Sequence, residues 1–529
     1  MRNRIHAIPW KDSRFRLVFP ILLWLLSATG CAGIPPLPHE SLSPDTISMI
    51  EPGEEVTCLR FSPFGSRLAA GTASGGIILI DPETLVSRER LEGHTGRVNA
   101  VSFSPDENTL LSAGDDGKVI LWPRAGPRQT LVSGEGPILD ATFLAEPNRI
   151  GLAGLYDGLS TFDTVTETLE RVSPPGGDEA IRSAVISRSG RYYAFAVRRP
   201  MSARGSEILI RDLLNKRLIA KISTFHRKVS RVHLAPHERW LVSVYDDGTV
   251  QVWEIDTGEP ILPGDGWEVD ADLAVTSFNG QWLAMVTRSG AAFLRDLSSQ
   301  VPGLQLVGPE RPVTALAWSP RGNLLLAADV SGGLWAWAIP PRDLTRPRDD
   351  SPRGVVGLDR LWDQLGDKDA ALAYSAMMAL ARGGDEMLNG VIRRIAIPDA
   401  GEVAGHRKLI EDMRSDDFAT REAAVSRLSD LARLPEDALR DALTEPSSGR
   451  FVPLARKLLG QMEPPYRRFP SRILQRRRGL LTLELNGTDT AMAFLKRVAM
   501  ESTSSTERGD AAAALRRGRV GRRAITRIR

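Results

Sequence analysis

The sequence predicts two folded parts, an all-β array of repeated units followed by an all-α region, and three observations support this fold class. A pattern of about forty-two residues recurs seven times between Ile47 and Ile339, which indicates one structural unit repeated along the chain. After Pro340 and Pro341 the apolar residues change from alternating spacing to three- and four-residue spacing, which is typical of amphipathic helices. The chain of 529 residues is 42% hydrophobic and 25% charged, which is ordinary for a soluble globular protein.

Each repeated unit consists of short alternating runs that are joined by turn sequences. The second unit is the clearest, because its runs are separated by Ser-Pro-Asp at 104–106 and by Asp-Asp-Gly at 115–117, which favour turns. From Pro105 to Trp122 is 17 residues, and six of the seven units keep this spacing. The fourth unit has 23 residues there, which indicates a six-residue insertion. The positions equivalent to Trp122 are 80, 162, 211, 253, 295 and 337.

Four-stranded units of this period resemble WD40 repeats, over roughly 293 of the 529 residues. The resemblance implies a seven-bladed β-propeller at residues 46–340 and is weakest in the third, fourth and sixth copies. Aligning Val56 with Val98 places residues 47–49 on residues 89–91, so the amino-terminal segment should supply the outermost strand of the seventh blade and close the ring. The family's His–Asp–Ser/Thr–Trp hydrogen-bond network falls here on His94, Ser112, Asp116 and Trp122. The fifth copy keeps a partial set, Ser243, Asp247 and Trp253, with Phe225 at the histidine position.

Few residues are suited to catalysis, and we assign no catalytic residue, metal ligand or cofactor. The seven histidines are scattered, and the two cysteines exclude a disulfide scaffold and a two-Cys, two-His zinc site. Cys58, Trp240 and Trp282 fit packing positions within strands better than a nucleophile or a sugar platform. We therefore predict a non-enzymatic interaction scaffold. The alternative is an envelope propeller enzyme or a cofactor-binding propeller, which converging Asp, Glu or His side chains in the central channel would favour.

The amino terminus has the features of an export signal. A basic leader precedes ten uncharged residues at 17–26, which is half the ~20 needed to span a bilayer. The following Ala28-Thr-Gly-Cys31 resembles the lipobox of bacterial lipoproteins. The resemblance implies a signal peptide at 1–30, a lipid on Cys31 and attachment to a membrane of the cell envelope, and Ala32 favours the outer membrane. An uncleaved anchor and an ordinary signal peptide remain alternatives. Residues 31–45 then form a proline-rich tether.

The carboxy-terminal third is predicted to be helical, with a linker at 341–356 and helices within 357–529. The spacing indicates helices at 358–365, 370–381, 418–431, 436–443, 453–462, 490–500 and 508–517. A Ser-Asp-Asp sequence at 415–417 can cap the third of them. Paired amphipathic helices of this kind resemble HEAT-type repeats, and the combination with a propeller resembles bacterial multidomain scaffold proteins.

Two arginine-rich segments are the candidate binding surfaces. The net charge of the whole chain is only +3, whereas residues 466–529 hold sixteen Lys and Arg against five Asp and Glu. This tail fits a solvated terminus, anionic lipid headgroups or an acidic protein; nucleic acid is not expected for an exported chain. Its densest runs are Arg476, Arg477, Arg478, Arg516, Arg517, Arg519, Arg522 and Arg523. The fourth-unit insertion carries Arg198, Arg199 and Arg204, which fit an acidic peptide. A tolerated surface insertion is the alternative, and it is slightly favoured because long loops cost little free energy.

Overall fold

The computed structural model describes residues 40–523 except for a set of short gaps, and all of its elements belong to one compact unit, Leu37–Arg529. The gaps are 51, 135, 145–147, 157, 174–179, 188, 199–204, 214–216, 225–226, 263, 265, 279, 298–303, 310, 340–354, 432–433, 445–448 and 461–470. The predicted signal peptide, Cys31, the linker at 341–354, Arg199 and Arg204 therefore lie outside the described residues.

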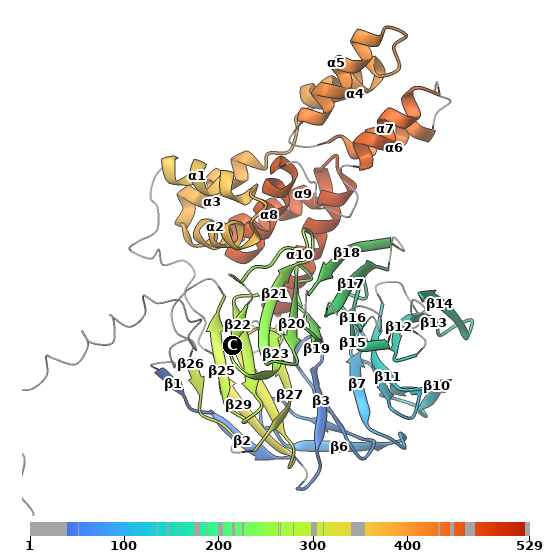
Figure 1. The fold of residues 1–529 in the computed structure, drawn as a ribbon, viewed down its shortest axis with the longest axis vertical. Helices are drawn as coiled ribbons and strands as arrows, with labels where there is room; N and C mark the ends of the chain where they lie inside the picture. The colour runs from blue at the N-terminus through green and yellow to red at the C-terminus, as the bar shows by residue number, and fades with distance from the viewer. Residues whose placement is uncertain are drawn as a thin grey trace, which may run out of the picture. The chain divides into compact units, whose positions relative to one another are not determined.

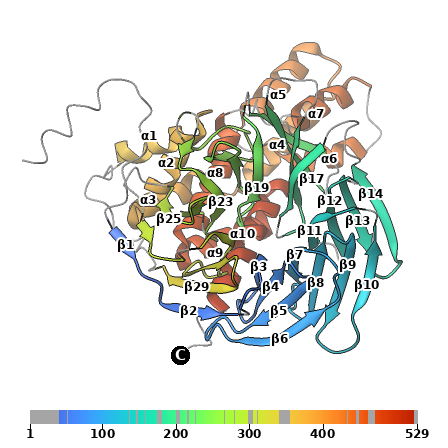
Figure 2. The same ribbon diagram turned by 60° about the horizontal axis from the view of Figure 1, so that its bottom comes forward.

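Seven sheets, antiparallel except for one strand pair of blade 6, form a ring of blades in the described part of the chain (Figures 1 and 2). The first strands of neighbouring blades are in contact all the way round, from β3 back to β3. Blade 1 consists of β3 Val56–Phe61, β4 Leu68–Thr72, β5 Gly76–Ile80 and β6 Ser87–Glu92. Blade 2 consists of β7 Val98–Phe103, β8 Thr109–Gly114, β9 Lys118–Pro123 and β10 Gln129–Ser133. Blade 3 consists of β11 Ile138–Phe143, β12 Arg149–Gly154, β13 Gly158–Asp163 and β14 Thr168–Ser173. Blade 4 consists of β15 Ala180–Ile186, β16 Tyr192–Arg198, β17 Ser206–Asp212 and β18 Arg217–Ser223. Blade 5 consists of β19 Val229–Leu234, β20 Trp240–Tyr245, β21 Thr249–Glu254 and β22 Trp267–Glu268. Blade 6 contains β23 Ala271–Thr276, β24 Trp282–Thr287, β25 Ala292–Asp296 and β26 Leu304–Leu306. Blade 7 contains β27 Val313–Trp318, β28 Leu324–Asp329 and β29 Gly333–Ala338.

The strand register confirms the sequence alignment of the seven units. In blade 2, Phe103 pairs with Leu110, which pairs with Trp122. The equivalent triplets in the other blades end at 80, 162, 211, 253, 295 and 337, the positions that the repeat spacing predicts. A β-bulge interrupts the pairing of the first and second strands in every blade, after the second residue pair in blade 4 and after the first pair in the other six. The spacing works as a predictor because each unit has the same bulge and the same pairing.

The ring closes as predicted, and the amino-terminal segment also adds a strand that the sequence did not indicate. β2 (Thr46–Met49) pairs antiparallel with β29 and is the outermost strand of blade 7. β1 (Glu40–Leu42) pairs parallel with β26 and makes blade 6 five-stranded. The prediction of a tether over 31–45 is therefore wrong for 40–42. The prolines of the tether stand at 35, 36, 38 and 44, so residues 40–42 keep the N–H groups that a sheet requires.

Turn chemistry sets the backbone between the strands. Gly117, in the turn between β8 and β9, has φ 70°, and a Cβ there would lie 2.4 Å from the Gly134 carbonyl oxygen. Glu107 and Glu238 occupy the same turn of blades 2 and 5 with φ of 62° and 59°, although the left-handed region is unfavourable for side chains with a Cβ. The carboxylate of each residue accepts hydrogen bonds from the preceding blade, and these bonds offset the backbone strain.

The core is a set of apolar layers between adjacent blades, because each sheet packs one face on each neighbour. The layer between blades 5 and 6 differs from the others, since it continues into the core of the helical region through residues such as Tyr374 and Leu358. The propeller and the first and last helices therefore share one hydrophobic core.

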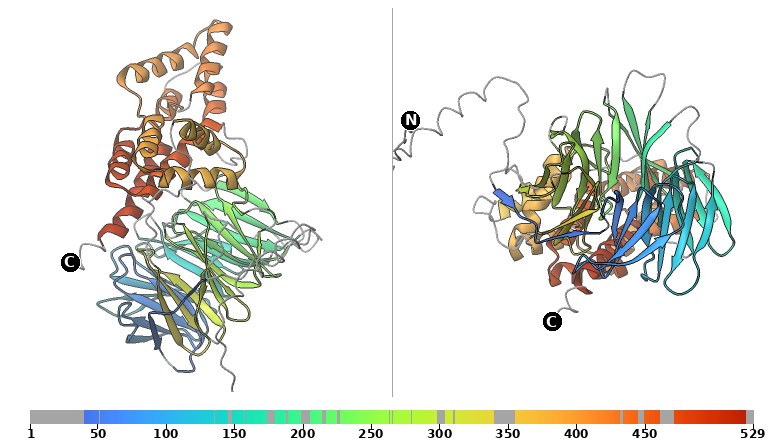
Figure 3. Two further views of the ribbon diagram at one scale, coloured as in Figure 1. Left: turned by 90° about the vertical axis from the view of Figure 1, so that its left-hand side faces the viewer. Right: turned by 90° about the horizontal axis from the view of Figure 1, so that it is seen from below.

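The residues described after the propeller form ten helices (Figure 3). They are α1 Val355–Leu365, α2 Ala370–Arg382, α3 Gly384–Arg394, α4 Ala400–Asp412, α5 Phe418–Asp430, α6 Glu436–Thr444, α7 Phe451–Gly460, α8 Ser471–Asn486, α9 Asp489–Glu501 and α10 Ser505–Arg523. α8–α10 return to pack on α1–α3, whereas α4–α7 form a separate cluster with its own core. This order differs from a linear stack of successive helix pairs, in which each pair contacts only its neighbours.

Sequence spacing finds seven of these helices and misses three. The predicted cap of α5 is confirmed, because the Asp417 carboxylate accepts a hydrogen bond from Thr420 N at 2.8 Å. α3 is missed because the two glycines after α2 indicate a stop. Gly383 does end α2, but Gly384 begins α3 at once. α4 and α8 are missed because their apolar residues do not gather on one face of the helix.

Candidate interaction surfaces

The predicted network of blade 2 is present and is buried. His94 Nδ1 lies 2.9 Å from Asp116 Oδ1, and His94 Nε2 lies 2.8 Å from Ser112 Oγ. The indole of Trp122 donates to the same Ser112 Oγ at 2.8 Å. Burial raises the pKa of Asp116, but hydrogen bonds from Thr95 N and His94 outweigh it and leave the pKa below its ordinary value. The four side chains use one another as partners, which suits a structural role in rigidifying the blade.

Blade 5 keeps part of this arrangement. Trp253 Nε1 donates to Ser243 Oγ at 2.9 Å. Asp247 accepts a hydrogen bond from Thr249 N and lies 3.6 Å from Arg227 Nε. The histidine position, 225–226, lies outside the described residues. The Trp–Ser link therefore recurs, while the aspartate has an arginine neighbour.

Blade 7 contains a related network that sequence reasoning missed. Asp329 accepts hydrogen bonds from Ser331 N, Gly333 N and the indole of Trp335, at 2.8, 3.0 and 3.2 Å. Burial raises the pKa of Asp329, but these bonds outweigh it and lower the pKa. The signal was the Asp-x-Ser-x-Gly-x-Trp order at 329–335, which lacks the histidine used to recognise the network.

Carboxylates also join neighbouring blades. Glu107 of blade 2 accepts hydrogen bonds from Phe64 N at 2.6 Å and from Ser66 Oγ at 2.5 Å, both in a turn of blade 1. Glu238 of blade 5 accepts from Ser189 N of blade 4 at 2.9 Å. Two equivalent turns are therefore clamped to the blade before them.

The prediction that Arg476, Arg477 and Arg478 form a basic surface is wrong. These residues are only 6, 6 and 3% exposed, because they lie in the middle of α8, which is packed on all sides. Consecutive helical residues point about 100° apart, so the three guanidinium groups reach three different partners. The run is interior and is not available to lipid headgroups.

Two of the three arginines join the helices to the propeller. Arg478 donates to the Glu254 carboxylate of β21 at 2.8 and 2.6 Å. Arg477 Nη2 lies 3.2 Å from Asp256 of blade 5 and 3.3 Å from Asp510 of α10. Arg476 stays within the helices, where its Nε donates to Glu507 at 2.8 Å. A single arginine run thus connects α8, α10 and blade 5.

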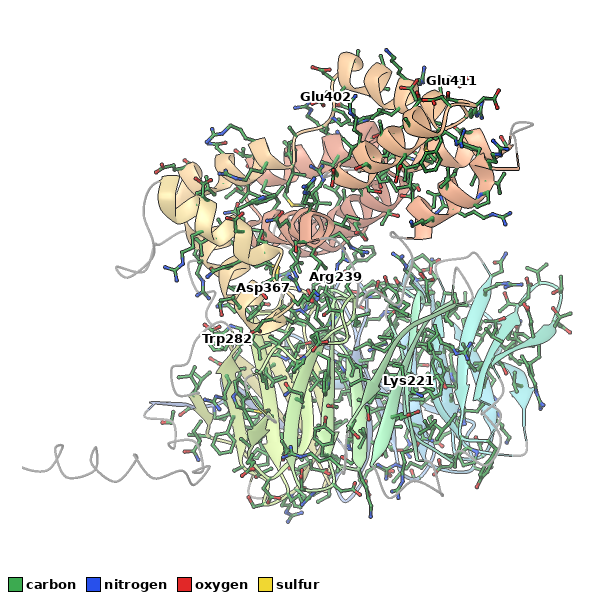
Figure 4. The ribbon with its side chains drawn as sticks, turned by 45° about the horizontal axis from the view of Figure 1, so that its top comes forward. Lys221, Arg239, Trp282, Asp367, Glu402 and Glu411 are labelled. Carbon is green, nitrogen blue, oxygen red and sulfur yellow. The ribbon has the colours of Figure 1, made fainter. Side chains whose placement is uncertain are left out.

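Other contacts complete this boundary, where Arg239 and Asp367 lie in Figure 4. Arg239 of the β19–β20 turn approaches Asp256 at 3.3 Å and Asp510 at 3.0 Å. Trp240 packs edge-on against Tyr374 of α2, with ring centroids 4.8 Å apart. Glu402 and Glu411 lie on α4, on the far side of the helices from the propeller (Figure 4). The propeller side chains at this boundary come from turns at one end of the strands, so the helices cover that face of blades 5 and 6.

Of the remaining predicted packing residues, the two tryptophans are buried and Cys58 is half-buried. Trp240 and Trp282 are both buried, Trp282 in the layer between blades 6 and 7. Cys58 lies on β3, where burial raises the pKa of its thiol to about 11. At neutral pH this thiol is protonated and is therefore a poor nucleophile.

The central channel carries a small polar group on the first strands of the blades. His233 of blade 5 has a pKa lowered to about 4 by burial and by the positive charge of Arg60 of blade 1. Asp140 of blade 3 has a pKa raised by burial, although Arg60 and backbone hydrogen bonds from Ile186 and Ala141 oppose the rise. Within the described residues no group of three or more His, Cys, Asp or Glu side chains is placed to hold a metal ion.

The other predicted surface residues are described only in part. Arg516, Arg517, Arg519, Arg522 and Arg523 lie on α10, but their side chains are outside the described residues. Of the insertion, Arg198 ends β16 and pairs in register with Ser206 of β17. None of the helices described is both long and apolar enough to cross a bilayer.

Comparison with known families agrees with the repeat pattern. The family described as WD domain, G-beta repeat matches residues 47–81, 85–123, 219–254 and 301–337. The propeller carries WD40 repeats. Each matched WD40 segment starts in the outer strand of one blade and ends in the third strand of the next, which is the offset that closes the ring. The matched copies belong to blades 1, 2, 5 and 7, so the three copies that the sequence marks as weak are the unmatched ones.

Individual relatives are similar to a fifth or less of this chain. WD repeat-containing protein 91 of Danio rerio is 39% identical over 84 residues, 15% of this chain and 12% of that protein. COMPASS component SWD1 of Saccharomyces cerevisiae is 29% identical over 106 residues, 19% and 25% of the two chains. Small ribosomal subunit protein RACK1y of Oryza sativa subsp. japonica is 32% identical over 111 residues, 20% and 33%. This chain therefore spans a third or less of the length of these relatives.

Among solved structures, the β-propeller domain of Cps50 (Swd1) from Myceliophteria thermophila is similar, with a TM-score of 0.46 and 20% identity. The similarity covers 56% of this chain and all of that domain.

Proposed function

We propose that this protein is a non-enzymatic protein-interaction scaffold, tethered by a lipid to a membrane of the bacterial cell envelope. The observation that carries the scaffold role is the fixed attachment of the helices to one face of the propeller by buried ion pairs such as Arg478–Glu254. Because the helices are fixed to the propeller, partners bound to these two parts would be held in a constant position relative to one another. The names of two relatives, a COMPASS component and a ribosomal subunit protein, place those proteins in assemblies.

The face of the propeller opposite the helices is the proposed partner site. β16 and β17 are joined at that face, so the insertion carrying Arg198, Arg199 and Arg204 starts and ends there. Tyr156, in the β12–β13 turn of the same face, is 68% exposed, and tyrosine is enriched in protein interfaces. An acidic peptide matches this combination of arginine donors and an aromatic ring.

The scaffold role is tested by crosslinking and affinity purification from solubilised envelope. We expect a triple alanine variant of Arg198, Arg199 and Arg204 to lose a partner that the wild-type protein recovers. The matched control is a triple alanine variant of Arg516, Arg517 and Arg519, which lie on α10 and are the remaining candidates for anionic lipid. Unchanged recovery from a folded insertion variant would exclude the insertion as the partner site.

Membrane attachment is tested separately through Cys31. A Cys31→Ser variant should accumulate as uncleaved precursor or as soluble protein, and it should lack the acyl group in a mass spectrum. Acylated, correctly processed Cys31→Ser protein would show that the anchor is elsewhere.

A ligand-binding propeller is the second candidate, and the polar group in the channel favours it. Arg60 of blade 1 interacts electrostatically with Asp140 of blade 3 and with His233 of blade 5. Native mass spectrometry of the purified protein should then show a retained small molecule that an Arg60→Met variant loses. An identical mass for both proteins, apart from the substitution, would argue against this candidate.

A further inference from the structure

The chain that enters the propeller runs along the outer rim of two blades. β1 is hydrogen-bonded to β26 of blade 6, and Val307 N donates to Leu42 O at 2.8 Å just beyond that pairing. β2 is hydrogen-bonded to β29 of blade 7. The segment is therefore part of both sheets. The chain that precedes it joins the propeller at β1.

Large apolar side chains are exposed along this segment. Ile47 and Met49 are 58 and 54% exposed, and they share one face of β2 because they are two residues apart on a strand. Val307, beside Leu42, is 47% exposed. Single exposed apolar residues are common, but Ile47 and Met49 lie on β2 and Val307 directly follows β26, the partner of β1. We call Ile47, Met49 and Val307 the rim residues.

The length of the chain limits how far a lipid on Cys31 can be from this rim. Glu40, the first residue of β1, is nine residues after Cys31, and nine residues span at most ~30 Å when fully extended. That is about the thickness of the hydrocarbon core of a bilayer. The lipid anchor belongs to the proposed function, and the following inference depends on it.

We propose that the rim of blades 6 and 7 rests on the surface of the bilayer, with Ile47 and Met49 in contact with the lipid. An acyl chain on Cys31 keeps this rim near the membrane, and exposed apolar side chains gain free energy by entering the headgroup region. The anchor then not only retains the protein but also orients it. The blades across the ring, with β14 on the opposite side from β1 (Figures 1 and 2), face away from the bilayer.

The orientation is measured with fluorophores at single positions of the full-length lipidated protein. Ile47→Cys and Met49→Cys carry the label at the rim. Val165→Cys and Leu169→Cys are the matched controls, since these residues of blade 3 are also apolar and exposed, at 70 and 49%. A lipid on Cys31 blocks that thiol, and Cys58 is half-buried with a pKa raised to about 11, so the label reacts preferentially at the introduced cysteine. The proteins are reconstituted in vesicles of phosphatidylethanolamine and phosphatidylglycerol that contain a nitroxide-labelled lipid.

We expect the fluorophores at 47 and 49 to be quenched at least threefold more than those at 165 and 169. The vesicles contain no other protein, so quenching reports contact with lipid. Equal quenching at all four positions, or none at 47 and 49, in protein that floats with the vesicles would overturn the rim contact and leave the anchor intact. Protein that does not float with the vesicles would overturn the anchor and the rim contact together.

A second measurement uses no label. Ile47→Ser with Met49→Ser should increase the fraction of protein released from vesicles by dilution, relative to Val165→Ser with Leu169→Ser. Equal release of the two double variants would contradict the rim contact.

Discussion

Arg478 on α8 donates two hydrogen bonds to the carboxylate of Glu254 on β21, and 224 positions of sequence separate the two residues. Both side chains are buried. Burial raises the pKa of Glu254, but the charge and hydrogen bonds of Arg478 outweigh it and hold the pKa below its ordinary value. Arg478 also donates to the carbonyl oxygens of Leu365 and Asp367 at 2.7 and 2.6 Å. One guanidinium group thus connects the propeller, the α1–α2 turn and α8.

Removing this arginine should strongly destabilise the protein. Arg478→Met leaves the Glu254 carboxylate buried without its counter-charge, which typically costs about 3–5 kcal/mol. The free energy of unfolding is measured by urea denaturation. Arg472→Met, at an exposed position of the same helix, is the matched control and should change stability by less than about 0.5 kcal/mol. Similar losses in the two variants would mean that the buried pair does not hold the domains together.

The network of blade 2 should contribute more to stability than the equivalent position of blade 6. Trp122→Ala removes a buried aromatic ring and the donor to Ser112, with an expected loss of about 3–5 kcal/mol. Trp122→Phe keeps most of the packing and should lose less. Arg295→Ala removes a cation–π contact with Trp267, at 4.0 Å, and should lose about 0.5–2 kcal/mol. Equal losses of melting temperature for Trp122→Ala and Arg295→Ala would contradict the structural role of the network.

Glu107 joins blade 2 to blade 1 through its carboxylate, and the free energy of these hydrogen bonds competes with the strain of its left-handed backbone. Glu107→Gly relieves the left-handed conformation, worth about 1–2 kcal/mol, but removes two hydrogen bonds to a charged group, each worth about 1.5–3 kcal/mol. We therefore expect a net loss of about 1–5 kcal/mol in chemical denaturation. Glu107→Gln keeps the backbone strain and tests the charge alone. An increase in stability of Glu107→Gly would show that strain dominates and that the clamp is weak.

The channel histidine should make stability depend on pH in mildly acidic solution. The folded protein lowers the pKa of His233 to about 4 from its ordinary 6.5, so between these values the unfolded chain binds a proton that the folded chain does not. Stability therefore decreases as pH falls from about 6.5 to about 4, by at most ~3 kcal/mol. His233→Gln should remove this part of the pH dependence and leave the dependence above pH 7 unchanged. Wild-type and variant curves of the same slope between pH 6.5 and 4 would contradict the burial of His233.

The blades were predictable from sequence because their information is local. Asp-Gly turns, bulged first strands and alternating residues recur at fixed spacing, and hence the positions equivalent to Trp122 fall in register in every blade. Ring closure by β2 was predictable for the same reason, since the repeat continues across the ends of the propeller. β1 was not predictable, because three residues without a repeat carry no signal of the strand they join.

The sequence by itself determined the seven repeats, the blade 2 network and several of the helices, whereas only the tertiary structure decided the role of the arginine run at 476–478. Read locally, three consecutive arginines are a solvated basic segment, because a charge is stable in water. Their burial is possible only because Glu254 and Asp256, more than 200 residues earlier in the chain, and Glu507 and Asp510 of α10 lie within reach in the folded protein. The free energy of a buried charge depends on partners that no local pattern identifies.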